Sequence, residues 1–353
     1  MVVLTTGYEL YVVDHGGIRW TQEMQARPNS GNTYSDASQE MTSFDGVAVS
    51  HGQQFVAYVD HATDIVVRSI RDGAEVSRVP YHAQGETQLR CLSSDGNFVA
   101  LASVPPDLPK GTTGDRLPWR VTIVDMRSGR ATIERPLEDL VKDRTAHDPK
   151  LQFSLYSLDW LPGHRLLVNY AGWQSETYSY DPGTKTMEKI PGMSWVMGVS
   201  DSGSVFGSGT GSEGGKYLIW DGQATQTLEL GTDSAVASGG AFNSRGDALA
   251  IGVMSSRYEP EGWQLFRLSE GQWKRSGALA ENSWMKAAPR AVSEDGTLAW
   301  TALEGGLAAW KNGRTSALLS HDFRSGAWQE WLEPNDLQVD LGQYPFVAII
   351  PGK

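Results

Sequence analysis

Short stretches of alternating apolar and polar residues recur along the whole chain, and each runs into a glycine-containing turn. One series reads YVVDHGG (11–17), VRSIRDG (67–73), IVDMRSG (123–129), SYDPGT (179–184), LIWDG (218–222), FRLSEG (266–271) and AAWKNG (308–313). Alternation with a period of two predicts β-strands. Asp-Gly, Asn-Gly and Ser-Gly pairs are typical of tight hairpin turns because glycine tolerates positive φ. The series therefore predicts seven similar hairpins.

A second series of turns lies between the members of the first. It reads VAVSHGQQFVAYV, CLSSDGNFVALAS, LDWLPGHRLLVNY, GVSDSGSVFGSG, AFNSRGDALAIGV and AVSEDGTLAWTAL. In each, a strand rich in small residues turns through a glycine into a strand rich in Val, Ala and Leu. The C-terminal PFVAIIPGK (345–353), written before the N-terminal MVVLTTG (1–7), has the layout of one more member. We therefore expect the chain to start and end inside a seventh turn of this series.

Two turns in each unit imply four strands in each unit, and seven such units are the blades of a β-propeller. The predicted fold is all-β, a seven-bladed β-propeller with four antiparallel strands per blade, formed by residues 1–353 as a single domain. We expect the C-terminal strand to complete the N-terminal blade in a 1+3 arrangement, which closes the ring and removes an open sheet edge. If the strands of a blade are named A to D from the axis outward, the second series is the A–B turn and the first series is the C–D turn.

Two of the A–B turns, SSDG (93–96) and SEDG (293–296), are close to the Ser-Pro-Asp-Gly turn that precedes an apolar strand in many propellers. With these turns, and with repeats over nearly the whole chain, the sequence resembles the superfamily of WD-repeat-like and TolB-like propellers. The Trp-Asp pair of WD repeats occurs once, at Trp220-Asp221, and no Gly-His pair accompanies it. The resemblance implies a fold and not an activity.

Composition narrows the range of partners. The net charge is −12, and no run of Lys and Arg occurs, so we expect neither nucleic acid nor an anionic membrane surface as a partner. No apolar run approaches about 18 residues, which predicts no membrane insertion of this chain. The single cysteine, Cys91, excludes an internal disulfide. This fits the cytoplasm, but an extracytoplasmic location stays open for a chain whose targeting segment was removed, since exported bacterial propellers also lack disulfides. We expect a monomer.

In the predicted topology, the B–C and D–A connections share one face of the propeller, and every long connection falls there. The expected long connections are 21–45, 104–118, 135–153, 254–262, 279–287 and 321–344. Because function usually lies on loops held by a rigid scaffold, we predict a binding site on this loop-rich face. The predicted binding residues are Arg116, Trp173, Arg257, Tyr258, Trp284 and Trp328. Their residue types dominate many binding energies, although loop Trp residues can also fold back and cover the blades. The charged segment 136–150 is expected to be a solvated insertion with one short helix.

No motif indicates a cofactor or a metal. GTGSEG (209–214) has the glycine spacing of a dinucleotide-binding loop, but a strand-like segment follows where a helix would be required. The seven His residues are scattered and Cys91 stands alone, so we predict no metal site. DHATD (60–64) carries carboxylates that suit Ca²⁺, but too few ligands.

Three kinds of function stay open. We favour a non-catalytic binding or scaffold module that recognises a protein, peptide or glycan on the loop-rich face. The second is an enzyme of lyase, hydrolase or isomerase type, with acid and base residues from several blades over the central channel. The sequence assigns no catalytic residues to this alternative. The third is a surface-tethered sensor domain whose anchor was removed.

Overall fold

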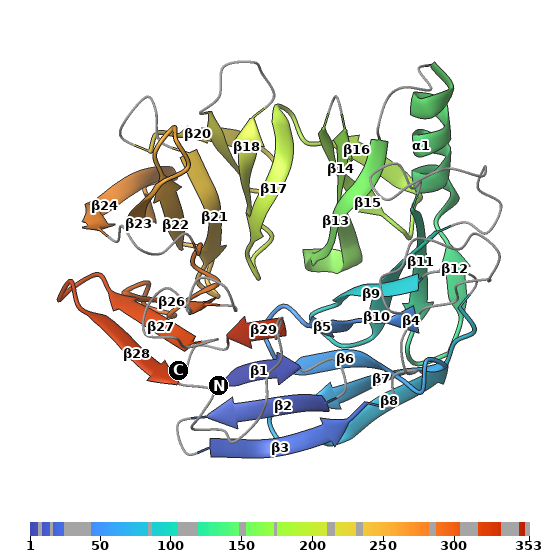
Figure 1. Ribbon diagram of the computed structural model, residues 1–353. Helices are drawn as coiled ribbons and strands as arrows, with labels where there is room; N and C mark the ends of the chain where they lie inside the picture. The colour runs from blue at the N-terminus through green and yellow to red at the C-terminus, as the bar shows by residue number, and fades with distance from the viewer. Residues whose placement is uncertain are drawn as a thin grey trace. The chain divides into compact units, whose positions relative to one another are not determined.

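The computed structural model describes residues 1–5, 9–14, 17–24, 44–83, 87–104, 119–147, 153–172, 175–209, 216–230, 236–281, 287–303, 317–332 and 346–349. These residues form seven antiparallel sheets of four strands in meander order, and one sheet gains a short fifth strand (Figure 1). Seven such sheets in succession are the blades of a β-propeller, so the predicted fold class is confirmed. The chain divides into two units, residues 1–22 with 191–353 and residues 23–190. The single domain stays a prediction.

The first unit contains blades 1, 5, 6 and 7, with strands given in sheet order from A to D. Blade 1 is β29 (Phe346–Ile349), β1 (Val2–Thr5), β2 (Glu9–Asp14) and β3 (Gly17–Glu23). Blade 5 is β17 (Met193–Val199), β18 (Val205–Gly209), β19 (Tyr217–Trp220) and β20 (Thr225–Leu228). Blade 6 is β21 (Val236–Phe242), β22 (Ala248–Met254), β23 (Pro260–Ser269) and β24 (Gln272–Glu281). Blade 7 is β25 (Ala291–Val292), β26 (Leu298–Leu303), β27 (Ala317–Asp322) and β28 (Trp328–Leu332).

The second unit contains blades 2, 3 and 4. Blade 2 is β5 (Val47–Val49), β6 (Phe55–Asp60), β7 (Asp64–Ser69) and β8 (Glu75–Pro80). Blade 3 is β9 (Thr87–Leu92), β10 (Phe98–Ser103), β11 (Arg120–Asp125) and β12 (Ala131–Ile133), and β4 (Phe44–Asp45) pairs parallel with β9. Blade 4 is β13 (Phe153–Leu161), β14 (Arg165–Gly172), β15 (Glu176–Asp181) and β16 (Thr186–Lys189). The helix α1 (Arg135–His147) connects blade 3 to blade 4.

The C-terminal strand lies beside the N-terminal one. β29 pairs antiparallel with β1, with Ile349 opposite Val2 and Phe346 opposite Thr5. The sheet of blade 1 therefore combines one strand from the end of the chain with three from its beginning. This is the strand order that the 1+3 arrangement requires.

A buried side-chain oxygen closes the A–B turn in five of the described blades. The residues that supply it are Ser50, Ser93, Ser200, Asn243 and Ser293. Ser93 Oγ, for example, accepts the main-chain N–H of Phe98 at 2.9 Å, and the N–H of Gly96 donates to the carbonyl of Ser93 at 2.9 Å. Gly96 reverses the chain with φ of 73°, a value that glycine adopts without strain. All six predicted A–B turns lie between an A strand and a B strand.

The C–D turn predicted for blade 7 is wrong. AAWKNG (308–313) was expected there, but the C and D strands of this blade are β27 and β28, so the turn is 323–327. Its hydrogen bonds repeat those of the C–D turn in blade 3. The N–H of Asp322 donates to Ala327 O at 2.9 Å, as that of Asp125 does to Arg130 O at 2.9 Å. The residues 308–313 lie outside the described part of the chain.

The segment predicted to be a solvated insertion is instead a packed helix. Leu137 and Val141 of α1 are 1% and 2% exposed and join the core formed by strands of blades 3 and 4. With Leu140 they occupy positions i, i+3 and i+4, which gives the helix one apolar stripe. Tyr170 of β14 also donates its hydroxyl to the carbonyl of Leu137 at 3.3 Å. The helix therefore fills the space between two sheets and forms part of the fold.

Deletion of residues 345–353 tests the pairing of β29 with β1. The deletion removes four paired positions and leaves the edge of β1 open. We expect the thermal midpoint of unfolding to fall by several degrees, measured by circular dichroism. An unchanged midpoint would show that β29 contributes nothing to blade 1.

The A–B turn of blade 7 should lose part of its stability in acid. Hydrogen bonds, first from Ser293 and then from Thr297, lower the pKa of Asp295 to about 2, whereas an unfolded Asp has a pKa of about 3.9. Stability from this carboxylate is therefore present above about pH 4 and is lost as the pH falls towards 2. Asp295→Asn should be less stable than wild type at pH 7, and urea denaturation should show the two proteins converging near pH 2. A gap that stays constant with pH would contradict this assignment.

Candidate binding site

The B–C turn of blade 6, Ser255–Glu259, carries two of the predicted binding residues. The N–H of Ser255 donates to Glu259 O, and that of Tyr258 donates to Ser255 O, both at 2.9 Å. Ser255 Oγ accepts the N–H groups of Arg257 at 3.2 Å and of Glu259 at 3.3 Å. Four hydrogen bonds therefore hold a turn of only five residues. The long connection expected over 254–262 is wrong, because β22 extends to Met254 and β23 begins at Pro260.

Tyr258 is presented to solvent from a strained backbone. Its side chain belongs to a residue that is 63% exposed, and its φ is 60°. A bulky residue in this left-handed region costs about 1–2 kcal/mol relative to the right-handed form. Glycine would avoid that cost, as Gly246 does with φ of 71° in the A–B turn of the same blade. The backbone therefore does not require tyrosine at this position, and Arg257 beside it is exposed as well.

Tyr217 of blade 5 lies within electrostatic range of the turn. Tyr217, at the start of β19, has a pKa raised first by its burial, and the charge of an ionised Tyr258 raises it further. The Tyr217 hydroxyl accepts the N–H of Ala237, the second residue of β21, at 2.7 Å. A buried phenol thus links blades 5 and 6.

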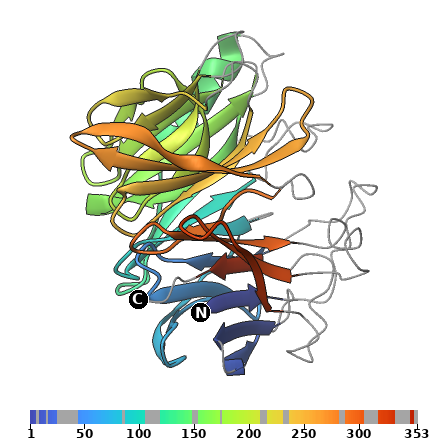
Figure 2. The same cartoon turned by 90° about the vertical axis from the view of Figure 1, so that its left-hand side faces the viewer.

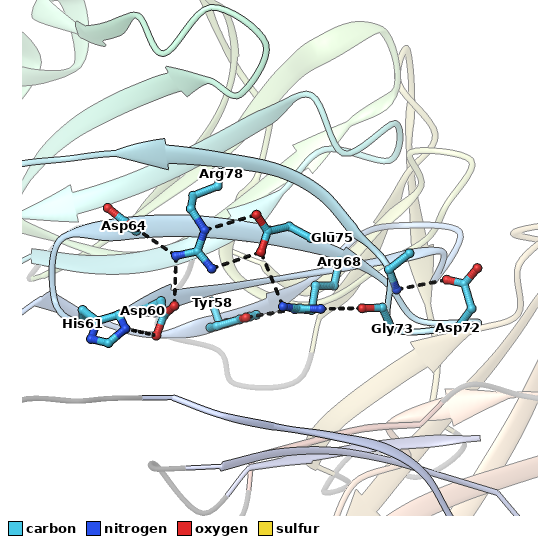
Figure 3. A network of polar contacts seen from close by, with 10 residues as sticks. Tyr58, Asp60, His61, Asp64, Arg68, Asp72, Gly73, Glu75 and Arg78 are labelled. Carbon is cyan, nitrogen blue, oxygen red and sulfur yellow. Dashed lines mark hydrogen bonds and ion pairs between the residues drawn. The ribbon is translucent and has the colours of Figure 1, made fainter.

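In the second unit, a single guanidinium gathers three carboxylates on blade 2 (Figure 3). Arg78 of β8 donates to Asp60 Oδ2 and to Asp64 Oδ2, both at 2.9 Å. It also donates to both carboxylate oxygens of Glu75, at 3.1 and 3.0 Å. These carboxylates, Glu75 foremost, raise the pKa of Arg78. The acidic side chains of DHATD (60–64) are therefore bonded to the guanidinium of an arginine.

The turn of this network is also strained. His61 and Ala62 have φ of 53° and 56°, and the N–H of Thr63 donates to Asp60 O at 3.1 Å. Positive φ values at both central positions of a turn define type I′, which usually contains Asn or Gly there. The side chain of Asp60 is only 7% exposed, so its pairing with Arg78 compensates for its burial. The arrangement is that of a structural ion-pair network.

Three of the predicted binding residues, Arg116, Trp173 and Trp284, lie outside the described residues. A fourth, Trp328, was placed wrongly in a long connection over 321–344. It begins β28, beside the short C–D turn, and is half-buried. Its ring packs against Trp263 with centroids 4.8 Å apart and against His321 with centroids 4.5 Å apart. Trp328 therefore packs against side chains of both blade 6 and blade 7.

Sequence reasoning did not predict that three carboxylates around α1 are buried. They are Glu134, Glu138 and Glu176. Glu176 pairs with Arg144 at 2.9 Å and with Lys189 at 2.5 Å, which joins the end of the helix to blade 4. Burial acts first to raise the pKa of Glu176, but its hydrogen bonds and the nearby cations outweigh it and lower the pKa. The apolar stripe of the helix was a signal that one face of the helix is buried.

Within the described ranges, no group of three or more His, Cys, Asp or Glu side chains is arranged to hold a metal ion. In that same part of the chain, no helix is both long enough and apolar enough to cross a membrane.

Comparison with known proteins adds a likeness of fold. The chain matches no protein-family model, and no curated protein matches it in sequence. Among solved structures, it is similar to the β-propeller domain of Cps50 (Swd1) from Myceliophteria thermophila. The two are 12% identical, the match covers 85% of this chain and 89% of that domain, and the TM-score is 0.48. Values this low carry no argument about function, and the assignment of the fold rests on the strand order.

Removal of Arg78 tests whether the network on blade 2 is structural. We expect Arg78→Met to lower the free energy of unfolding by about 2 kcal/mol, because Asp60 then stays buried without its cation. Arg245→Met is the control, since Arg245 pairs with Glu294 at an exposed position and should contribute less than about 0.5 kcal/mol. Equal values from urea denaturation would show that the network does not serve stability.

Proposed function

We propose that the protein is a non-catalytic binding module, a propeller of the WD-repeat-like or TolB-like kind, that recognises a protein or peptide through the B–C turn of blade 6. The observation that carries this proposal is Tyr258, an aromatic residue 63% exposed and with φ of 60°. A strained aromatic residue that contacts solvent supports a role of its side chain in binding. Strained residues of this kind cluster at ligand-binding positions.

The chemistry of the turn supports a protein partner. Tyr and Arg are among the residues that most often dominate the energy of protein interfaces, and Tyr258 and Arg257 stand next to each other. The four hydrogen bonds of the turn hold both residues in place before binding, which lowers the entropy lost on association. Arg116, Trp173 and Trp284 stay proposed members of this surface, and Trp328 does not.

The net charge of the chain restricts the kinds of partner that are favoured. A net charge of −12 favours the approach of a neutral or basic partner over long distances. Arg257 supplies a local donor for a carbonyl or carboxylate of that partner and thereby fixes its orientation.

Tyr258→Gly separates binding from folding. The variant removes the ring and relieves the strain, so the thermal midpoint should stay equal or rise while partner binding falls at least about tenfold. Affinity purification on immobilised wild type and variant, with quantitative mass spectrometry, should identify a protein that wild type retains and Tyr258→Gly loses. The matched control is Glu270→Gly, which relieves a φ of 53° at the other end of β23.

The outcomes differ for each alternative. Loss of the same protein on Glu270→Gly would show a general effect of the substitutions on blade 6. Equal retention by wild type and Tyr258→Gly would refute the proposed surface. Binding of wild type to a glycan array, lost in Tyr258→Gly, would identify a sugar as the ligand.

A further inference from the structure

The outermost strand of blade 6 is unusually long. β24 has 10 residues, whereas the other D strands in the described part of the chain have 3 to 7. With β23 it forms the long orange hairpin in Figure 2. A D strand has a neighbour on one side only, so its other edge presents main-chain N–H and C=O groups. Such an edge can accept an added strand from another chain.

One side chain already bonds to this edge as a strand would. The amide nitrogen of Gln226, on β20, donates to Gly271 O at 2.5 Å. The amide oxygen of Gln226 accepts the N–H of Trp273 at 3.1 Å. In a parallel ladder, one residue of a strand bonds in this way to the residues before and after its opposite neighbour. Gln226 thus acts as a single residue of a strand placed beside Gln272.

The edge continues past the point where Gln226 ends. The N–H of Trp273 points away from β23, and outward groups alternate along a strand, so the N–H and C=O of Arg275 point outward too. Lys274, opposite Arg267, directs its main-chain groups to β23. Gln226 bonds to the main chain of Gly271 and Trp273. In the described residues, no side chain bonds in this way to the main-chain N–H and C=O of Arg275.

The charge at this edge differs from that of the whole chain. Lys274 and Arg275 are exposed and adjacent; Lys274 Nζ lies 3.7 Å from Glu270 Oε2, and Arg275 is the cation on the outward-facing position. Antiparallel pairing of two copies of β24 would bring these cations close together, which is unfavourable. A strand with acidic side chains would meet them with opposite charge.

We propose that the outer edge of β24 around Arg275 binds an extended acidic segment of a partner protein as an added β-strand. Gln226 marks where the added strand ends, since its amide occupies the preceding position. The segment contacts the outward N–H and C=O of Arg275 through its main chain, and the guanidinium of Arg275 through its carboxylates.

A synthetic peptide tests this proposal without knowledge of the natural partner. The probe is a fluorescein-labelled peptide of alternating Glu and Val, and its control carries N-methyl groups on alternate main-chain nitrogens. Fluorescence anisotropy should show saturable binding of the probe to wild type, and at least tenfold weaker binding of the methylated control. Arg275→Glu should weaken binding of the probe at least tenfold as well. Tyr258→Gly should bind the probe as wild type does, so this result is independent of the site proposed on the B–C turn.

Two further variants separate the main chain from the charge. Arg275→Gln and Arg275→Pro lose the same charge, but only proline removes the outward N–H, and edge strands tolerate proline. Arg275→Pro should therefore bind the probe more weakly than Arg275→Gln. In wild type, the probe should slow hydrogen exchange of the Arg275 amide and leave that of Lys274 unchanged, because the Lys274 amide is already bonded within the hairpin.

Three results would overturn the proposal. Equal binding of the methylated peptide would show that charge alone attracts the probe. Equal binding by Arg275→Glu would place the probe elsewhere. A wild-type dimer in light scattering that Arg275→Pro abolishes would show that a second copy occupies the edge.

Discussion

A buried side-chain oxygen at the end of strand A is the interaction on which five of the described blades depend for their A–B turn. In blade 6, Asn243 Oδ1 accepts the N–H groups of Asp247 and Ala248, both at 3.0 Å, where β22 begins. This contact sets the register of β22, and a slip by one residue would turn its buried side chains to the other face. The same strand leads into the B–C turn. The position of Tyr258 at one end of the blade is thus set by a buried amide at the other end.

Turn chemistry made most of the fold predictable, because it is local. The pair Asp95-Gly96 is a turn signal within a few residues of sequence, and it predicts the turn without information on distant residues. The C–D turn of blade 7 shows the limit. AAWKNG (308–313) and the segment 322–327 both carry turn residues, and only the pairing of β26 with β27 decides between them. Strand pairing is a long-range property that local propensity does not contain.

The candidate site was harder to predict, for the same reason. Arg257 and Tyr258 were predicted because Arg and Tyr in a connection are a local signal, but the strain at Tyr258 belongs to the folded backbone. Trp328 was misplaced because its partner, Trp263, comes from the neighbouring blade. The packing of α1 depended likewise on strands of two blades. What a side chain touches across blades decides its role, and a single sequence does not show it.

The pairing of β29 with β1 has a consequence for synthesis of the protein. More than 300 residues separate Thr5 from Phe346, which lie opposite each other. At about 5–20 residues per second, a ribosome needs roughly 20 to 70 seconds to make that stretch. Throughout this time β1 of the nascent chain lacks its partner, and its free edge is open to pairing with other chains. Blade 1 is therefore the first blade to emerge and the last to be completed, and this sheet is where a chaperone would be needed longest.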